Sequence, residues 1–158
     1  MLRVHSMIYL GFFLGLLLLA SCDPHIAYEK NTRINDCRWN RDSVAQFDVH
    51  IVDASQPYEV SVTIRHNNFY PYNNLVFSLE QRPALKDDTT GTVELSLAKS
   101  DGRWIGQSAG NLYLINHTVL ERYHFPDTGM YQFSVKHHME DHQLRGITDV
   151  GLKIAQKP

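Results

Sequence analysis

The chain has 158 residues, of which 43% are hydrophobic and 20% are charged, and its formal net charge at pH 7 is −2. This length suits one domain and this hydrophobic content suits a packed core, so the composition excludes a globally disordered protein. Because 15 basic residues stand against 17 acidic ones, there is no basic excess, and we expect no nucleic-acid partner.

The first element in chain order is an export signal over residues 1–21. Arg3 supplies the positive charge with which such signals begin, and residues 7–19 form an apolar segment. That segment is shorter than the roughly 20 apolar residues that a membrane-spanning helix requires. Pro24 would also end any helix that continued beyond it. We therefore predict that residues 1–21 are a removable signal peptide.

The signal ends in Leu19-Ala20-Ser21-Cys22, which resembles the bacterial lipobox. In a lipobox the cysteine thiol accepts a lipid, and a peptidase then cuts before the cysteine. We therefore predict that Cys22 carries lipid such as palmitate. Each buried acyl methylene contributes about 0.8 kcal/mol, so two or three chains hold a protein stably on a membrane. The alternatives are an ordinary signal peptide with a coincidental cysteine and an uncleaved anchor.

The predicted location is the cell envelope, with the protein held to a membrane by its lipid. We favour the periplasmic face of the outer membrane, while Asp23 after the lipidated cysteine leaves the inner membrane open. The second cysteine, Cys37, has no disulfide partner if lipid occupies the sulfur of Cys22. We expect it to be a small buried apolar residue.

Residues 22–42 are predicted to be the lipidated N-terminus and a polar tether. From residue 43 to residue 158 the hydrophobic pattern has a period of two, which predicts a domain of β-strands. The alternating segments are 45–51, 58–64, 75–79, 93–97, 131–135 and 150–154. Segment 111–125 is ambiguous and could form a strand, a bend and a second strand. Strands with one apolar face must pack on each other, so we predict an all-β, two-sheet antiparallel sandwich, either jelly-roll or immunoglobulin-like.

The nine histidines invite a metal-binding interpretation, above all the run at residues 137–142. Adjacent residues on a strand point to opposite faces, so His137 and His138 cannot share a site without a bend. We interpret the run as a solvated loop and predict no metal site. The sequence has no Gly-x-Ser-x-Gly elbow, no His-Glu-x-x-His motif and no phosphate-binding glycine loop. We therefore predict no catalytic residues, no enzymatic activity and no cofactor.

The most distinctive stretch is residues 66–74, in which Tyr70 and Tyr72 lie among asparagines. The interpretation that we favour is structural, with the tyrosine rings capping the core of a small sandwich. The other is functional: Tyr70, Tyr72 and Trp104 are candidates for partner binding, because aromatic rings combine apolar area with hydrogen-bonding groups.

Short motifs spread along the chain in order carry a family resemblance. They are Cys22-Asp23-Pro24, Tyr28-Glu29, Trp39, Gln56-Pro57-Tyr58, Arg65-His66-Asn67, Tyr70-Pro71-Tyr72-Asn73-Asn74-Leu75, Asp101-Gly102-Arg103-Trp104, Gly106, Gly110, Phe125-Pro126, Gly129-Met130-Tyr131-Gln132-Phe133 and Gly146-Ile147-Thr148-Asp149-Val150-Gly151-Leu152. Together they resemble the gliding-motility lipoprotein family GldH of the Bacteroidetes. The resemblance implies an envelope lipoprotein whose partners belong to the gliding machinery and, through it, to the type IX secretion apparatus.

Two functions of different classes fit these observations. The first is a non-enzymatic binding or assembly module, held to the membrane through Cys22 and presenting loops to envelope proteins. The second is a glycan-binding sandwich that uses Tyr70, Tyr72 and Trp104, together with Tyr113, as flat aromatic faces. A hydrolase built from loop carboxylates ranks below both.

Overall fold

The computed structural model describes residues 25–82 and 91–157. Within these ranges the chain is almost entirely β, with one short 3-10 turn, η2 (Asn35–Cys37). The strands are β1 (Ile26–Arg33), β2 (Arg38–Asn40), β3 (Ala45–Ile51), β4 (Tyr58–Asn67), β5 (Asn74–Arg82), β6 (Val93–Ser96), β7 (Gln107–Ala109), β8 (Leu112–Tyr123), β9 (Gly129–His137), β10 (Gln143–Arg145) and β11 (Ile147–Gln156). In the described part of the chain, no helix is long and apolar enough to span a bilayer. The predicted signal and Cys22 lie outside the described residues.

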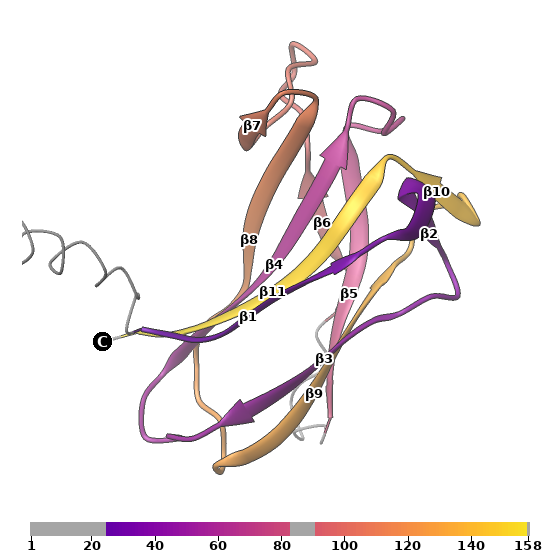
Figure 1. The fold of residues 1–158 in the computed structure, drawn as a ribbon. Helices are drawn as coiled ribbons and strands as arrows, with labels where there is room; N and C mark the ends of the chain where they lie inside the picture. Colours follow the sequence, from indigo (N-terminus) through magenta and orange to yellow (C-terminus); the bar gives the residue numbers. More distant parts are fainter. Residues whose placement is uncertain (1–24, 83–90, 158) are drawn as a thin grey trace, which may run out of the picture.

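The strands form two antiparallel sheets that face each other, with a small third sheet at one end (Figure 1). One sheet has the order β1-β11-β4-β8-β7, and the other has the order β3-β9-β5-β6. Strand pairing is nested along the chain: β1 pairs with β11, β3 with β9, β4 with β8, and β5 with β6. Nested pairing of eight strands across two sheets is the jelly-roll arrangement. The predicted sandwich is confirmed, and the jelly roll is the topology it adopts.

Alternating burial explains why these segments form strands and where the core lies. Along β3 every second side chain is buried, from Ala45 through Phe47 and Val49 to Ile51. β9 pairs with β3 in the same sheet, with Phe47 directly opposite Phe133 in register and both fully buried. Burying each such side chain contributes about 1.5–3 kcal/mol, so the space between the two sheets is the main source of stability.

The N-terminal segment departs from the prediction. We expected residues 22–42 to be a tether, but from Ile26 onward the chain is part of the sandwich. β1 pairs with β11 from Ile26 to Arg33, and β2 pairs with β10 in the small sheet. β1 is an edge strand with no fully buried side chain, which is why its sequence lacks clear alternation. The domain therefore begins well before residue 43.

The ambiguous segment forms one long strand, β8, with irregular pairing. Its register against β4 shifts on both sides of Val60, and Arg122 near its end has a φ of 50°. Such bulges interrupt the two-residue period, because side chains beyond them change faces.

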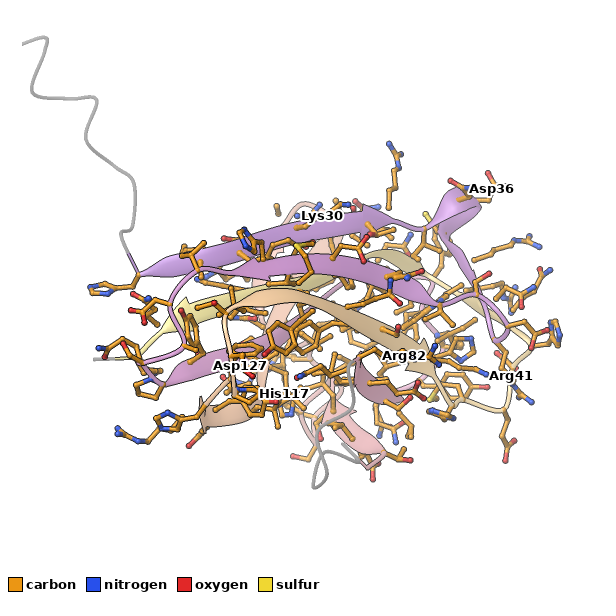
Figure 2. The ribbon with its side chains drawn as sticks, turned by 90° about the horizontal axis from the view of Figure 1, so that it is seen from below. Lys30, Asp36, Arg41, Arg82, His117 and Asp127 are labelled. Carbon is orange, nitrogen blue, oxygen red and sulfur yellow. The ribbon has the colours of Figure 1, made fainter. Side chains whose placement is uncertain are left out.

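The two ends of the sandwich carry different elements. The proximal end is where the chain enters at Ile26 beside the end of β11, and it also carries the turns that join β3 to β4 and β8 to β9. The distal end carries η2, the β2–β10 ribbon and the loops at 68–73 and 97–106 (Figure 1). Asp36 and Arg41 lie at this distal end, away from the point of entry (Figure 2).

A candidate binding surface at the distal end

The topology brings five aromatic rings together at the distal end. His66 is at their centre, 4.6 Å from the Trp104 ring and stacked 5.4 Å from the Tyr113 ring, between ring centroids. Tyr70 lies 5.6 Å from His66 and 6.0 Å from Tyr72. We call these five residues the aromatic cluster. It joins β4 and β8 of one sheet to the two distal loops, so it closes this end of the core.

The three predicted partner-binding residues have different roles in this cluster. Tyr70 is buried, with 3% of its surface exposed, and its hydroxyl donates to the Asn74 carbonyl at 2.7 Å. Burial raises the pKa of this hydroxyl well above its usual value. Tyr72 and Trp104 are half-buried and lie beside it. Tyr70 therefore caps the core, as the favoured structural interpretation predicts, and offers no flat face for a glycan.

Polar contacts fix the two partly exposed rings. The Trp104 indole N–H donates to the Asn68 side-chain carbonyl at 3.1 Å. Partial desolvation and the Asp141 carboxylate raise the pKa of Tyr72, because both disfavour its phenolate. Asp141 belongs to the loop after β9, so Tyr72 connects two distal loops. Side chains of the distal loops therefore contact one another across this end.

Two buried histidines stabilise the same end in their neutral form. His66 is fully buried, and one ring nitrogen bonds the Asn67 carbonyl at 3.2 Å. His137 is also fully buried, and its Nε2 bonds the Trp39 carbonyl at 3.1 Å. Burial lowers the pKa of both imidazoles because it penalises the charged form. The second nitrogen of each ring is buried without a hydrogen-bond partner.

The histidine-rich run at 137–142 differs in part from the predicted solvated loop. Its exposed members are interrupted by buried His137 and by Met139, whose sulfur accepts a hydrogen bond from the Val76 amide. The Arg41 guanidinium donates to the carbonyls of Met139 and Glu140, which ties the run to the turn after β2. The sequence gives no sign of this because the anchors come from distant strands. Among residues 25–82 and 91–157, no three His, Cys, Asp or Glu side chains are placed to hold a metal.

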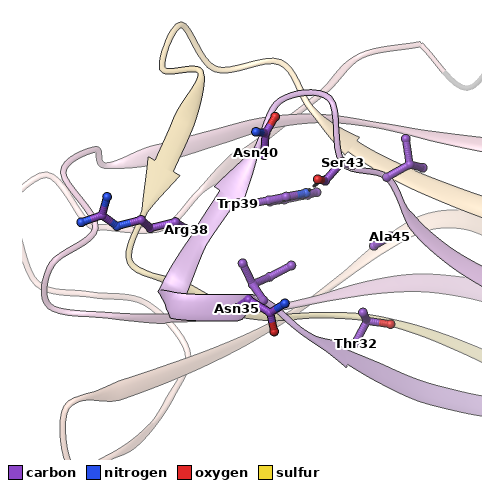
Figure 3. A pocket seen from close by; sticks show the side chains of 9 residues that line it. Thr32, Asn35, Arg38, Trp39, Asn40, Ser43 and Ala45 are labelled. Atoms are coloured by element: carbon purple, nitrogen blue, oxygen red, sulfur yellow. Dashed lines mark hydrogen bonds between the residues drawn. The ribbon is translucent and has the colours of Figure 1, made fainter.

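The β2–β10 ribbon presents polar side chains that the sequence analysis did not single out. Trp39 and Leu144 face inward and are buried, while Arg38 lies directly opposite Arg145 on the exposed side. The Trp39 indole N–H donates to the Ser43 carbonyl, and Arg38 extends away from that ring (Figure 3). Asn40 pairs with Gln143 two register positions further along the ribbon. The outer face of the ribbon is therefore an arginine pair beside an amide pair.

Two hollows flank this arginine pair. One, of about 200 Å³, is lined by both arginines, by Phe69 and by Gly146, among others. The other, of about 480 Å³, is lined by Asn35, Asp36, Arg38 and Gln143. Phe69 is 78% exposed, although it is large and apolar. Exposed aromatic and arginine side chains around a hollow are typical of protein-binding surfaces.

Strained backbone shapes the edge of these hollows. Asp36 and Cys37 both adopt left-handed conformations, with φ values of 54° and 52°. These conformations are unfavourable for residues other than glycine, and consecutive ones are held only by surrounding contacts. The Cys37 carbonyl accepts a hydrogen bond from Gly146 at 2.8 Å. Cys37 itself is a free, half-buried cysteine and not the buried apolar residue that we expected.

The carboxyl groups with shifted pKa values do not resemble a catalytic pair. Hydrogen bonds from Ser55 lower the pKa of Asp53, and hydrogen bonds from Arg103 lower that of Asp101. A lowered pKa keeps a carboxylate ionised, whereas a general acid must hold its proton. The two residues lie at opposite ends of the sandwich.

Comparison with known proteins places the chain in a family. The profile of the GldH lipoprotein family matches residues 26–154, which is most of the chain and nearly all of the sandwich. The chain belongs to the GldH lipoprotein family. The resemblance found in the sequence motifs is thereby confirmed.

Two similar proteins carry the same family name. A gliding motility lipoprotein GldH homolog of Christiangramia forsetii is 29% identical over 90% of this chain and 91% of its own length. The gliding motility lipoprotein GldH of Flavobacterium johnsoniae is 29% identical over 91% of this chain and 93% of its own length. A solved structure from desmodium yellow mottle tymovirus covers 87% of this chain and 90% of that one, with 14% identity and a TM-score of 0.29, which is too low to support an argument.

Proposed function

We propose that this GldH-family lipoprotein is a non-enzymatic binding module of the cell envelope. Lipid on Cys22 anchors the proximal end to a membrane, and the distal end contacts proteins of the gliding machinery. The single observation that carries the proposal is that the two ends of the sandwich differ. The chain enters at one end, and the exposed Arg38, Arg145 and Phe69 gather at the other.

The short link between Cys22 and β1 determines which end of the sandwich lies near the membrane. Only Asp23, Pro24 and His25 separate Cys22 from the first residue of β1. A fully extended chain spans at most about 3.6 Å per residue, so Ile26 lies within roughly 14 Å of the lipidated residue. β1 then pairs with β11 as far as Arg33, with one register irregularity between Ile26 and Tyr28. The proximal end is thus held close to the bilayer, and the distal end is presented to soluble or membrane-bound partners.

The construction of the distal end supports binding in preference to catalysis. Its aromatic cluster is packed ring against ring, and Trp104 is fixed to Asn68, so the surface is rigid before a partner arrives. A preorganised surface loses little side-chain entropy on association, which favours affinity. One of its two hollows places the exposed ring of Phe69 beside both arginines, and the other is lined by polar side chains.

Photo-crosslinking in the producing bacterium tests the proposal. A photoreactive amino acid replaces Phe69 at the distal end or, as a matched control, Val52 at the proximal end, since these side chains are 78% and 73% exposed. We expect protein adducts from position 69, and lipid adducts or none from position 52. Absence of protein adducts from position 69 and from its distal neighbour Asn68 would refute the binding function.

A further inference from the structure

The arginine pair on the β2–β10 ribbon is the feature that the proposed function leaves unexplained. Arg38 and Arg145 are directly opposite each other in register, and both side chains are exposed. Like charges at directly opposite positions destabilise a strand pair. Among the described residues, the ion pairs within 4 Å join Arg65 to Asp149, Arg103 to Asp101, His142 to Asp42 and Lys157 to Glu59, and none involves this pair. Within the part of the chain that the structure describes, no ion pair therefore relieves this repulsion.

We propose that Arg38 and Arg145 form a docking site for an acidic segment of a partner protein. The proposal deepens the proposed function and rests on it. Paired guanidinium groups bind carboxylates through charge-assisted hydrogen bonds, which are stronger than neutral ones. The amide side chains of Asn40 and Gln143 continue the polar face along the ribbon, so it can bind more than one group of an extended segment.

Phe69 indicates that the occupant is a protein. It lines the same hollow as both arginines and exposes most of its ring, so the site combines two cations with an apolar contact. Arginine and aromatic residues carry a large share of the binding energy at protein interfaces. The site also lies at the distal end, away from the bilayer that the proposed anchor occupies. An acidic segment with an apolar residue beside its carboxylates matches this surface.

The neighbouring charged groups do not neutralise the positive charge of the docking site. Asp36 on η2 lines both hollows together with Arg38, but it makes no ion pair within 4 Å. Arg41 on the following turn uses its guanidinium for the carbonyls of Met139 and Glu140 and so ties down that loop. The Asp42 carboxylate pairs with His142. The unpaired charge on the ribbon itself is positive.

Charge reversal tests the docking site in the full-length protein in cells. With the photoreactive group at position 69, Arg38→Glu and Arg145→Glu are compared with Arg103→Glu, an equal charge change at the distal end outside the ribbon. We expect each ribbon variant to lower the yield of the protein adduct roughly tenfold, since hydrogen bonds to charged groups contribute on that scale. We expect Arg103→Glu to leave the yield unchanged, and the crosslinked partner peptide to contain Asp or Glu.

Stability measurements separate lost binding from misfolding. Arg145→Glu replaces a repulsive cross-strand pair by an attractive one, so the purified variant should melt roughly 1–4 °C higher while its adduct is lost. An unchanged adduct yield in both ribbon variants, a partner peptide without acids, or a lipid adduct at position 69 would overturn the docking site. Protein adducts that survive charge reversal would leave the proposed function standing, whereas their absence from the whole distal end would remove both.

Discussion

Gly146 contacts three segments of the distal end, namely η2, the end of β4 and the loop at 68–73. Replacing it with alanine is the sharpest test of this architecture. It lies between β10 and β11 with a φ of +86°, where alanine is strained. Its amide donates to the Cys37 carbonyl at 2.8 Å, and its carbonyl accepts from the Asn67 amide at 2.9 Å. A methyl group there would lie 2.6 Å from the Tyr70 Cα and also overlap the Tyr70 amide nitrogen. Both obstacles are backbone atoms, which cannot rotate away.

The magnitude follows from two separate costs. A left-handed alanine costs about 1–2 kcal/mol. The forced displacement of the Tyr70 backbone adds about 1–3 kcal/mol, as in other overpacked sites. We therefore expect Gly146→Ala to lower the free energy of unfolding by about 2–5 kcal/mol, measured by urea unfolding of the purified domain.

Gly102→Ala is the matched control. Gly102 has nearly the same φ, +81°, but a methyl group there meets nothing within 4 Å. The Gly102→Ala variant should lose only the conformational cost of about 1–2 kcal/mol from its free energy of unfolding. Equal losses of stability in the two variants would refute the close approach of Gly146 to the 68–73 loop.

Three further predictions concern the buried histidines, the tyrosines and the first strand. Because burial lowers the pKa of His66 and His137 in the folded state, the unfolded chain binds more protons below about pH 6.5. The two histidines should contribute fully to stability above pH 6.5, and this contribution should be lost as the pH falls toward their pKa values in the folded state. Equal free energies of unfolding in urea at pH 7.5 and pH 5.0 would contradict this. Tyr70→Phe should lower the free energy of unfolding by about 1 kcal/mol because the Asn74 carbonyl loses its donor, while Tyr72→Phe at the half-buried neighbour should change it by less than about 0.5 kcal/mol in thermal unfolding. Removing residues 26–33 should strongly lower the melting temperature or prevent folding, because β11 would lose one of its two neighbouring strands and become an edge strand, whereas an unchanged melting temperature would restore the tether interpretation.

Local pattern predicted the central strands because one face of each is buried. β3, β4, β5, β6, β9 and β11 coincide with the alternating segments, and their inward residues contribute to the core. β1 escaped prediction because an edge strand buries few side chains, and β8 because bulges change its facing residues. The choice of a jelly roll depends on the pairing of β1 with β11, at opposite ends of the domain, which no short window of sequence contains.

The candidate site was predictable only in part, for the same reason. The pattern of residues 66–74 marked Tyr70 and Tyr72, and the fold brings Trp104 to them. The sequence did not reveal that Tyr70 is buried, because an aromatic ring in a polar loop can point either way. Arg38 and Arg145 are far apart in the sequence and each is unremarkable alone. Only the register of β2 against β10 makes them a pair.

Intact-mass analysis of the protein purified from its own membranes tests the central claim most directly, namely that a lipid at the proximal end sets the orientation of the domain. We predict a mature chain that begins at Cys22 and carries the mass of two or three acyl chains. A chain that begins elsewhere, or an unmodified thiol at Cys22, would contradict the account.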